Sequence, residues 1–229
     1  MSLSTTNSAF DTVRARASAS LGASSEPIHR TVVSALAARQ IRGGTFVDVG
    51  CGRGDLRRTL DDRFDRYVGF DAVRYDGLPA DVDFHAVDLD GDDWHVPTLS
   101  ADVVAAVETI EHLENPWRFV RTLVHLTKPG GWVVVTTPNQ LSALSLATLL
   151  VKHRFSAFQD PMFPVHRTAL LESDLRRVLS SAGLTNIGVH FTERGRLPLT
   201  PLHFPRAIAR VFPRALSDNI VVIGQRPRD

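Results

Sequence analysis

The regular alternation of short apolar runs with helical segments constrains the fold of this chain more than any other feature. The run at 131–138 is nearly continuous in apolar β-branched residues, which is typical of a strand in a sheet covered on both faces. Strands that alternate with helices at this spacing indicate parallel pairing through right-handed crossovers. The sequence therefore predicts an α/β fold. The expected strands are 45–50, 66–71, 82–89, 101–108 and 131–138, and the expected helices are 26–41, 55–64 and 116–127.

The alternation ends at residue 138, and the rest of the chain is organised differently. Two further strands are expected, and a proline-rich stretch with a short helix separates them, so that the last pair resembles a hairpin. Seven strands are expected in all. Residues 1–25 are rich in Ser, Ala and Thr and predict a flexible N-terminal arm before a single domain, 26–229. The later segments are an insertion at 139–166, a helix at 168–184, strands at 185–193 and 218–226, and a short helix at 204–212.

Length and composition narrow the class of protein further. With 229 residues, 43% of them hydrophobic, the chain is long enough for one globular core. A net charge of +1 gives no bulk argument for binding to nucleic acid or to an anionic membrane. With one cysteine, no signal-like segment and no apolar run of membrane-spanning length, the chain is expected to be a cytoplasmic protein. Five arginines make the C-terminal part locally basic, which fits either an anionic substrate or a solvated surface: Arg194, Arg196, Arg206, Arg210 and Arg214.

The sharpest local signal is "VDVGCGRG", residues 47–54, where the first strand passes into a helix. Its glycines, Gly50, Gly52 and Gly54, allow positive φ and a close approach of the backbone to a ligand, although a plain tight turn needs glycine too. The spacing is not the G-x-G-x-x-G of dinucleotide-binding loops, which argues against an NAD-dependent oxidoreductase. Asp48 precedes the loop, and a carboxylate there suits a ligand with an ammonium or sulfonium group better than a phosphate.

Two further acidic residues close the next two expected strands. Asp71 stands where a ribose-diol acceptor would, and Asp88 stands where an acceptor for an adenine amino group would. Each alone is more often a loop or capping residue. Asp48, Asp71 and Asp88 all stand at the carboxyl end of a strand, and open α/β sheets bind ligands at that edge. Together they predict a nucleoside-containing ligand.

Five stretches of the sequence resemble the ordered motifs of class I S-adenosylmethionine-dependent methyltransferases. They are "FVDVGCGRGDL", "YVGFDAV", "HAVDLD", "VETIEHLENPWRFVRTLVHLTKPGGWVVVTTPN" and "LRRVLSSAGL". The resemblance spans roughly residues 27–190 and implies a Rossmann-like, seven-stranded, mostly parallel sheet in the order 3-2-1-4-5-7-6. Strand 7 is then antiparallel, helices cover both faces of the sheet, and the cofactor is S-adenosyl-L-methionine.

The same resemblance implies a cofactor-binding role for individual residues of this chain. Asp48 and the loop Gly50–Gly54 would hold the methionine part, with Cys51 a small loop residue rather than a nucleophile. Asp71, followed by Ala72, would take the ribose hydroxyls. The adenine would be bordered by Asp88 and Leu89, and the sulfonium side would be lined by Val107 and Glu108.

The chemistry of methyl transfer draws attention to "VETIEHLENP", residues 107–116. A hydroxyl acceptor must lose a proton, so a general base or a metal ion is expected near the transferred methyl group. If the segment turns helically, Glu108, Glu111 and His112 share one face, and His166 is a later residue that can join them. These four residues could bind Mg²⁺ or another divalent ion. Alternatively His112 or His166 acts as the base without a metal and Glu111 orients the loop, or the cluster is mainly structural.

The E-x-x-E-H pattern is similar to that of ubiquinone-pathway O-methyltransferases and of small-RNA 2′-O-methyltransferases. The leading expectation is O-methylation of a small molecule or glycan in a bacterial biosynthetic pathway, with the insertion 139–166 as a lid over the acceptor site. The alternatives are a metal-dependent RNA 2′-O-methyltransferase, which the near-neutral charge disfavours, and a non-catalytic cofactor-binding partner protein. Monomer and homodimer are both open.

Overall fold

The computed structural model describes residues 3–91, 94, 100–198 and 200–228. In this part of the chain seven strands form one sheet in the order β3-β2-β1-β4-β5-β7-β6, as the resemblance implies. Strands β1 to β5 pair in parallel, and β7 runs antiparallel to both β5 and β6. The strands are β1 (Thr45–Val49), β2 (Arg66–Asp71), β3 (Asp83–Ala86), β4 (Ala101–Ala106), β5 (Thr127–Pro138), β6 (Thr185–Phe191) and β7 (Asn219–Gln225).

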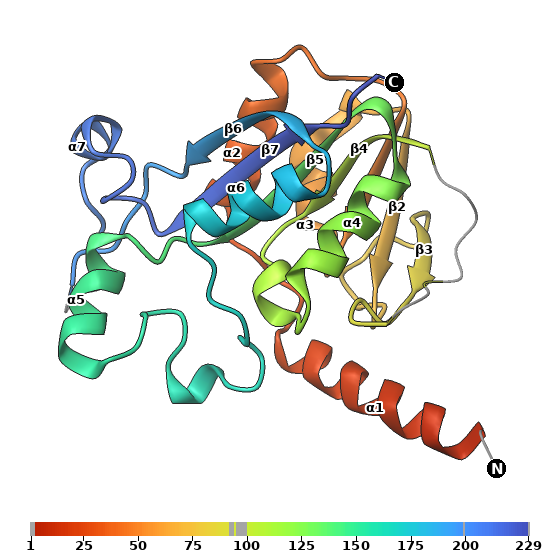
Figure 1. Ribbon diagram of the computed structural model, residues 1–229, viewed down its shortest axis with the longest axis horizontal. Helices are drawn as coiled ribbons and strands as arrows, with labels where there is room; N and C mark the ends of the chain where they lie inside the picture. Colours follow the sequence, from red (N-terminus) through yellow and green to blue (C-terminus); the bar gives the residue numbers. More distant parts are fainter. Residues whose placement is uncertain (1–2, 92–93, 95–99, 199, 229) are drawn as a thin grey trace.

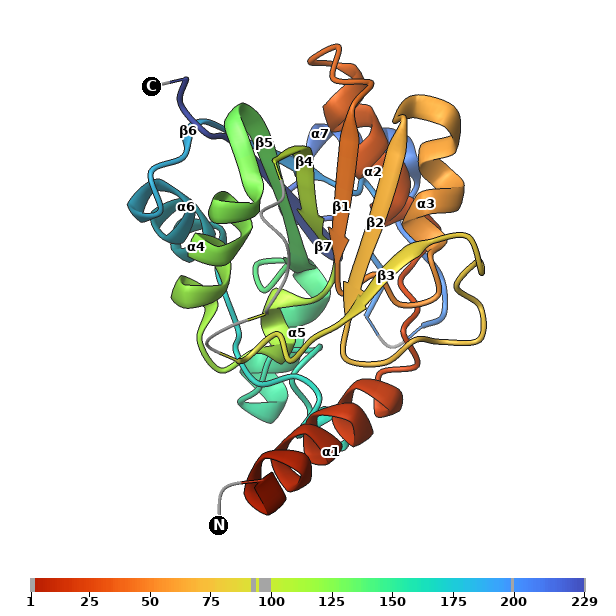
Figure 2. The same ribbon diagram turned by 90° about the vertical axis from the view of Figure 1, so that its right-hand side faces the viewer.

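Helices cover both faces of the sheet, and each face has its own apolar core (Figures 1 and 2). Alternate residues of a strand point to opposite faces, so Val47 and Val49 pack on the α4 and α6 side while Phe46 packs on the α2 and α3 side. The prediction of a sheet buried on both faces is therefore confirmed. These helices are α2 (Glu26–Ala37), α3 (Asp55–Leu60), α4 (Pro116–Leu126) and α6 (Glu172–Ser181).

The N-terminal segment differs from its prediction. The sequence predicts a flexible arm over residues 1–25, but the structure contains helix α1 (Leu3–Ala19), which crosses the carboxyl edge of the sheet (Figure 1). Tertiary contacts hold it there: Arg16 forms an ion pair with Asp90 at 3.0 Å, and the Tyr75 hydroxyl donates a hydrogen bond to the Ala17 carbonyl oxygen at 2.6 Å. These partners are distant in sequence, so local composition carries no sign of them.

The insertion 139–166 contains helix α5 (Ala143–Lys152) and a short 3-10 turn, Asp160–Met162. A second peripheral helix, α7 (Arg206–Val211), lies in the connection between β6 and β7. The Ala143 amide donates to the Ala215 carbonyl oxygen at 2.7 Å, which joins the start of α5 to the chain that follows α7. Among the described residues, no helix has the length and apolar character needed to cross a membrane.

Candidate cofactor and acceptor site

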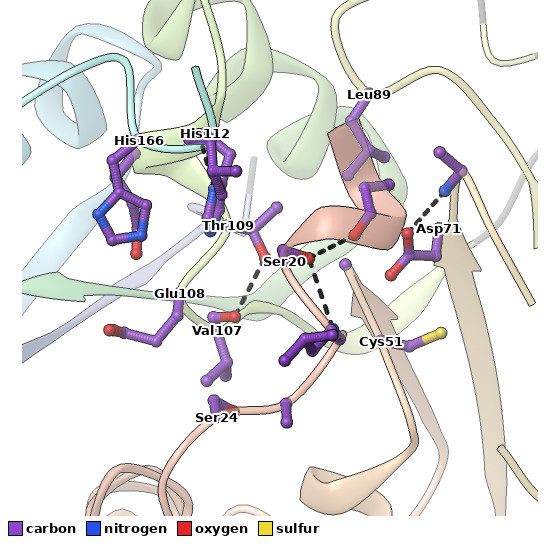
Figure 3. A pocket seen from close by; sticks show the side chains of 18 of the residues that line it. Ser20, Ser24, Cys51, Asp71, Leu89, Val107, Glu108, Thr109, His112 and His166 are labelled. Carbon is purple, nitrogen blue, oxygen red and sulfur yellow. Dashed lines mark hydrogen bonds between the residues drawn. The ribbon is translucent and has the colours of Figure 1, made fainter. Parts of the chain in front are cut away.

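A cavity of about 550 Å³ lies at the carboxyl edge of the sheet, between the core strands, α1 and the end of the insertion. Figure 3 shows Asp71 and Cys51 at one end and His112 and His166 at the other, with Ser20 between them. Most of the predicted site residues line this cavity: Asp48, Gly50, Cys51, Asp71, Ala72, Asp88, Leu89, Val107, Glu108, Glu111, His112 and His166.

The glycine loop follows β1 as predicted, and its conformation requires glycine. Gly50, Gly52 and Gly54 have φ values of 78°, 51° and 74°, in the left-handed region that other residues rarely adopt. Space is also lacking, because a Cβ at Gly50 would lie 2.2 Å from the Thr109 hydroxyl oxygen. A Cβ at Gly52 would lie 2.2 Å from the Gly22 carbonyl oxygen. The loop is therefore fixed by its own backbone and by the chain that follows α1.

Asp48 presents an acceptor to the cavity. Its Oδ2 accepts a hydrogen bond from the Tyr67 hydroxyl, and its Oδ1 has no hydrogen-bond partner among the described residues. Burial raises the pKa of Asp48 to about 7; the Tyr67 hydrogen bond lowers it, and the nearby Asp71 raises it further. A buried carboxylate with a free oxygen would be stabilised in its ionised form by a cationic ligand group.

Asp71 orders the loop as well as lining the cavity. Its Oδ2 accepts from the Gly52 amide at 3.0 Å, and its Oδ1 accepts from the Ala72 amide at 2.7 Å. Burial raises the pKa of Asp71, and the backbone amide hydrogen bonds oppose that shift. The carboxylate thus couples the end of β2 to the glycine loop next to it in the sheet.

The chain before β1 also contributes to the cavity, and the sequence had indicated only His29 there as a residue that could close over cofactor or substrate. Ser20, Ser24 and His29 line the cavity, and the Ser24 hydroxyl lies 2.6 Å from His29 Nε2. Arg16 also lines it, and the Arg16–Asp90 ion pair is mostly buried, with both side chains 14% exposed. No periodicity or motif in the Ser- and Ala-rich N-terminus marks Arg16, Ser20 or Ser24, since their place depends on how α1 packs.

Glu108 departs from the predicted arrangement of the E-x-x-E-H segment. It has a left-handed φ of 49°, and the 3-10 turn Ile110–His112 begins only after it. The segment therefore does not turn as one helix from residue 108. Thr136 donates to Glu108 Oε1 at 2.8 Å and Asn219 donates to Oε2 at 2.7 Å. Both carboxylate oxygens thus have partners on β5 and β7, and Glu108 is not part of the group of close ligand atoms that the other three residues form.

The other three residues do come together. Glu111, His112 and His166 each offer a carboxylate oxygen or a ring nitrogen, and these atoms all lie within 4.8 Å of one another. Glu111 is fully buried, and neither of its carboxylate oxygens has a hydrogen-bond partner among the described residues. Burial and the neighbouring Glu108 carboxylate raise the pKa of Glu111, and the nearby Thr137 hydroxyl opposes this shift.

Both imidazoles are oriented by backbone carbonyl oxygens. His112 Nδ1 lies 2.9 Å from the Val165 oxygen, and His166 Nδ1 lies 2.7 Å from the Ala157 oxygen. A carbonyl oxygen only accepts, so Nδ1 carries the hydrogen in each ring, and the neutral ring keeps a lone pair on Nε2. Burial lowers the pKa of both residues, that of His112 to about 4. A buried unpartnered carboxylate beside two oriented neutral imidazoles fits the ligand preferences of a divalent ion.

A family comparison agrees with this architecture. Residues 25–189 match the family described as "Methyltransferase domain". A "probable S-adenosylmethionine-dependent methyltransferase" from Mycolicibacterium smegmatis is 28% identical over 197 residues, which cover 83% of this chain and 71% of that protein. The ubiquinone biosynthesis O-methyltransferase of Bordetella bronchiseptica is 33% identical over 112 residues, and the match covers 45% of this chain and 46% of that enzyme. The similarity to that enzyme thus spans less than half of either protein.

Solved structures show the same fold at low sequence identity. A SAM-dependent methyltransferase from Archaeoglobus fulgidus has a TM-score of 0.61 and 16% identity, and the match covers 86% of this chain and 94% of that one. The N-methyltransferase NodS of Bradyrhizobium japonicum, in complex with S-adenosyl-L-homocysteine, has a TM-score of 0.53 and 14% identity, over 87% of this chain and 85% of that one. With its sheet order and its glycine loop, the chain belongs to the methyltransferase-domain family and is a class I S-adenosylmethionine-dependent methyltransferase.

Proposed function

We propose that this enzyme methylates a hydroxyl oxygen of a small molecule or sugar, and that Glu111, His112 and His166 hold a divalent ion beside the acceptor. The observation that carries the proposal is Glu111, whose buried carboxylate has no hydrogen-bond partner in the described part of the chain while two neutral imidazoles lie next to it. A buried carboxyl group either takes up a proton, as the raised pKa of Glu111 indicates, or is stabilised in its ionised form by a cationic ligand. The two adjacent imidazole nitrogens favour the ligand.

The cofactor end of the cavity is assigned from the groups that face it. Asp48 would take the methionine ammonium group through its free oxygen, next to the backbone of Gly50 and Gly52. Asp71 would accept from the ribose hydroxyls, with Ala72 beside it. Asp88 and Leu89 would border the adenine, and Val107 would line the sulfonium side. Cys51 is buried, and burial raises the pKa of its thiol, so it would act as a neutral loop residue.

At the acceptor end the protein's own residues would orient the acceptor and help to remove the proton of its hydroxyl group. Three protein ligands leave coordination positions open, and a divalent ion there would lower the pKa of an acceptor hydroxyl that reaches it. His112 and His166 would hold their Nε2 atoms toward the acceptor, because the Val165 and Ala157 carbonyl oxygens fix both rings. Holding acceptor and cofactor in line then replaces a bimolecular encounter with a step within one complex.

A second candidate role uses the same residues without a metal ion. The lowered pKa of His112 and of His166 keeps both rings neutral at neutral pH, so either could accept the hydroxyl proton directly. The partial match to ubiquinone biosynthesis O-methyltransferases supports an oxygen acceptor under either role. Met162 and Val165 from the insertion line the cavity, which supports residues 161–166 as the acceptor-side wall.

The test measures S-adenosyl-L-homocysteine release with sugars, phenols and short RNAs as acceptors. We expect turnover with a phenol or sugar, loss of turnover in chelator, and recovery with Mg²⁺ or Mn²⁺. The variant His166→Ala should lose Mn²⁺ binding, measured by electron paramagnetic resonance, whereas the exposed His125→Ala should keep it. Turnover that is indifferent to chelator would replace the metal role with the base role. Turnover with RNA alone would overturn the small acceptor.

A further inference from the structure

Helix α7 turns its apolar side to the solvent. Ile208 and Val211 are spaced i and i+3 on this helix, so they share one face, and Phe212 follows directly after the helix; the three residues are 47%, 68% and 59% exposed. Among the six residues of α7, Ala209 alone is buried. An ordinary surface helix has the reverse arrangement, with its apolar stripe packed on the core. The exposed stripe therefore needs a function other than packing.

Basic residues surround this stripe. Residues 194–217 contain five arginines and no aspartate or glutamate, and Arg206, Arg210 and Arg214 recur every four residues around α7. Arg210 pairs with Glu193 and Arg214 pairs with Glu172, but the two arginine side chains remain 67% and 63% exposed. Exposed ion pairs contribute little and exchange readily, so these guanidinium groups can turn to phosphate oxygens that approach the surface.

Helix α5 adds a second exposed apolar element on the same side of the molecule (Figure 1). Leu150 and Val151 are 80% and 78% exposed, and Lys152 follows them. Ser145 alone is buried among the ten residues of α5. The hydrogen bond from the Ala143 amide to the Ala215 carbonyl oxygen links the two elements. We call the surface formed by Leu150, Val151, Lys152, Arg206, Ile208, Arg210, Val211, Phe212 and Arg214 the α5–α7 face.

We propose that the α5–α7 face docks on a lipid bilayer that carries anionic headgroups. An interfacial helix places its apolar side at the boundary of headgroups and acyl chains, and flanking cations meet the phosphates. Both kinds of group are exposed together on α7. A second copy of the chain fits this face less well, because it would bring the α7 arginines of two molecules close together. Nucleic acid also fits less well, because it would leave the apolar residues exposed to water. The docking is peripheral, because no described helix can cross the membrane.

The experiment is flotation of the full-length protein with large vesicles, either of phosphatidylcholine alone or with phosphatidylglycerol added. We expect flotation with the anionic vesicles that weakens at high salt, and little with phosphatidylcholine alone. The double variant Val211→Ser/Phe212→Ser should reduce partitioning by about tenfold, because it removes the apolar contact. Trp117→Ser changes an apolar residue on α4 that is 44% exposed, and should float like the wild type.

Two arginine variants distinguish electrostatic attraction to the headgroups from insertion of the apolar side chains. Arg206→Gln should weaken flotation, whereas Arg121→Gln on the exposed side of α4 should not. All variants must bind S-adenosyl-L-homocysteine as the wild type does, which shows that they are folded. Absence of flotation with anionic vesicles, or equal flotation of the double variant, overturns the proposal. Concentration-dependent dimerisation or RNA binding that the double variant loses, without vesicle binding, overturns it in favour of those partners.

Discussion

His112 and His166 meet edge to face with ring centroids 4.8 Å apart, and a single segment orients both. The Ala157 and Val165 carbonyl oxygens, which accept from the two Nδ1 atoms, both belong to the end of the insertion. The insertion therefore sets the tautomer of each imidazole as well as supplying one of them. This arrangement makes the acceptor end of the cavity sensitive to changes in a segment outside the core sheet.

Replacing Glu111 should separate catalysis from folding. Glu111→Gln keeps the shape of the side chain but removes the carboxylate, so we expect turnover to fall by about a hundredfold or more. Stability in chelator should stay equal or rise, because the buried carboxylate has no hydrogen-bond partner among the residues that the structure describes. Turnover and thermal denaturation measure the two effects. Glu114→Gln, at an exposed carboxylate, should change turnover little, and an active Glu111→Gln enzyme would contradict the assigned role.

Asp71 should be required for cofactor binding. The variant Asp71→Ala removes the acceptor of the Gly52 and Ala72 amides, so the glycine loop loses its anchor to β2. Hydrogen bonds to a charged group contribute about 1.5–3 kcal/mol each, and we expect affinity for S-adenosylmethionine to fall by about a hundredfold. Isothermal titration calorimetry measures it. Asp76→Ala, at an exposed residue of the same loop region, is the control, and unchanged affinity in Asp71→Ala would refute the assignment.

The ion pair of Arg16 with Asp90 should hold α1 over the cavity. Arg16→Ala removes a mostly buried pair, so we expect α1 to detach and cofactor dissociation to accelerate by about tenfold. Hydrogen exchange of residues 3–25 and stopped-flow dissociation provide the measurements. Arg42→Ala changes an exposed arginine outside α1 and should leave both unchanged. If α1 is equally protected in wild type and Arg16→Ala, the ion pair is not its anchor.

His112 should make stability depend on pH. Burial lowers its pKa from 6.5 to about 4 in the folded protein, so between these values the unfolded chain binds a proton that the folded chain does not. Stability contributed by the neutral ring is present above pH 6.5 and is lost as the pH falls toward 4. The stability difference between wild type and His112→Gln should shrink across this window in denaturant unfolding.

Much of the cofactor end followed from the sequence alone. The strands could be predicted because each is a local run of apolar residues. The carboxyl ends of parallel strands must then lie at one edge of the sheet. Asp48, Asp71 and Asp88 therefore had to lie near one another once β1, β2 and β3 paired. The glycine loop was equally predictable, because glycine adopts left-handed φ values far more readily than other residues.

The acceptor end was decided by tertiary structure. Helical spacing placed Glu108 on one face with Glu111 and His112, but Thr136 and Asn219 donate hydrogen bonds to its two carboxylate oxygens and turn them toward β5 and β7. His166 lies beside Glu111 and His112 because the insertion folds back over the cavity. No local sequence periodicity predicts this fold. Helix α1 lies across the site through contacts with Asp90 and Tyr75. The sequence by itself determined the sheet and the cofactor loop, because their causes are local. Only the tertiary structure decided which side chains meet over the acceptor, since those contacts join distant parts of the chain.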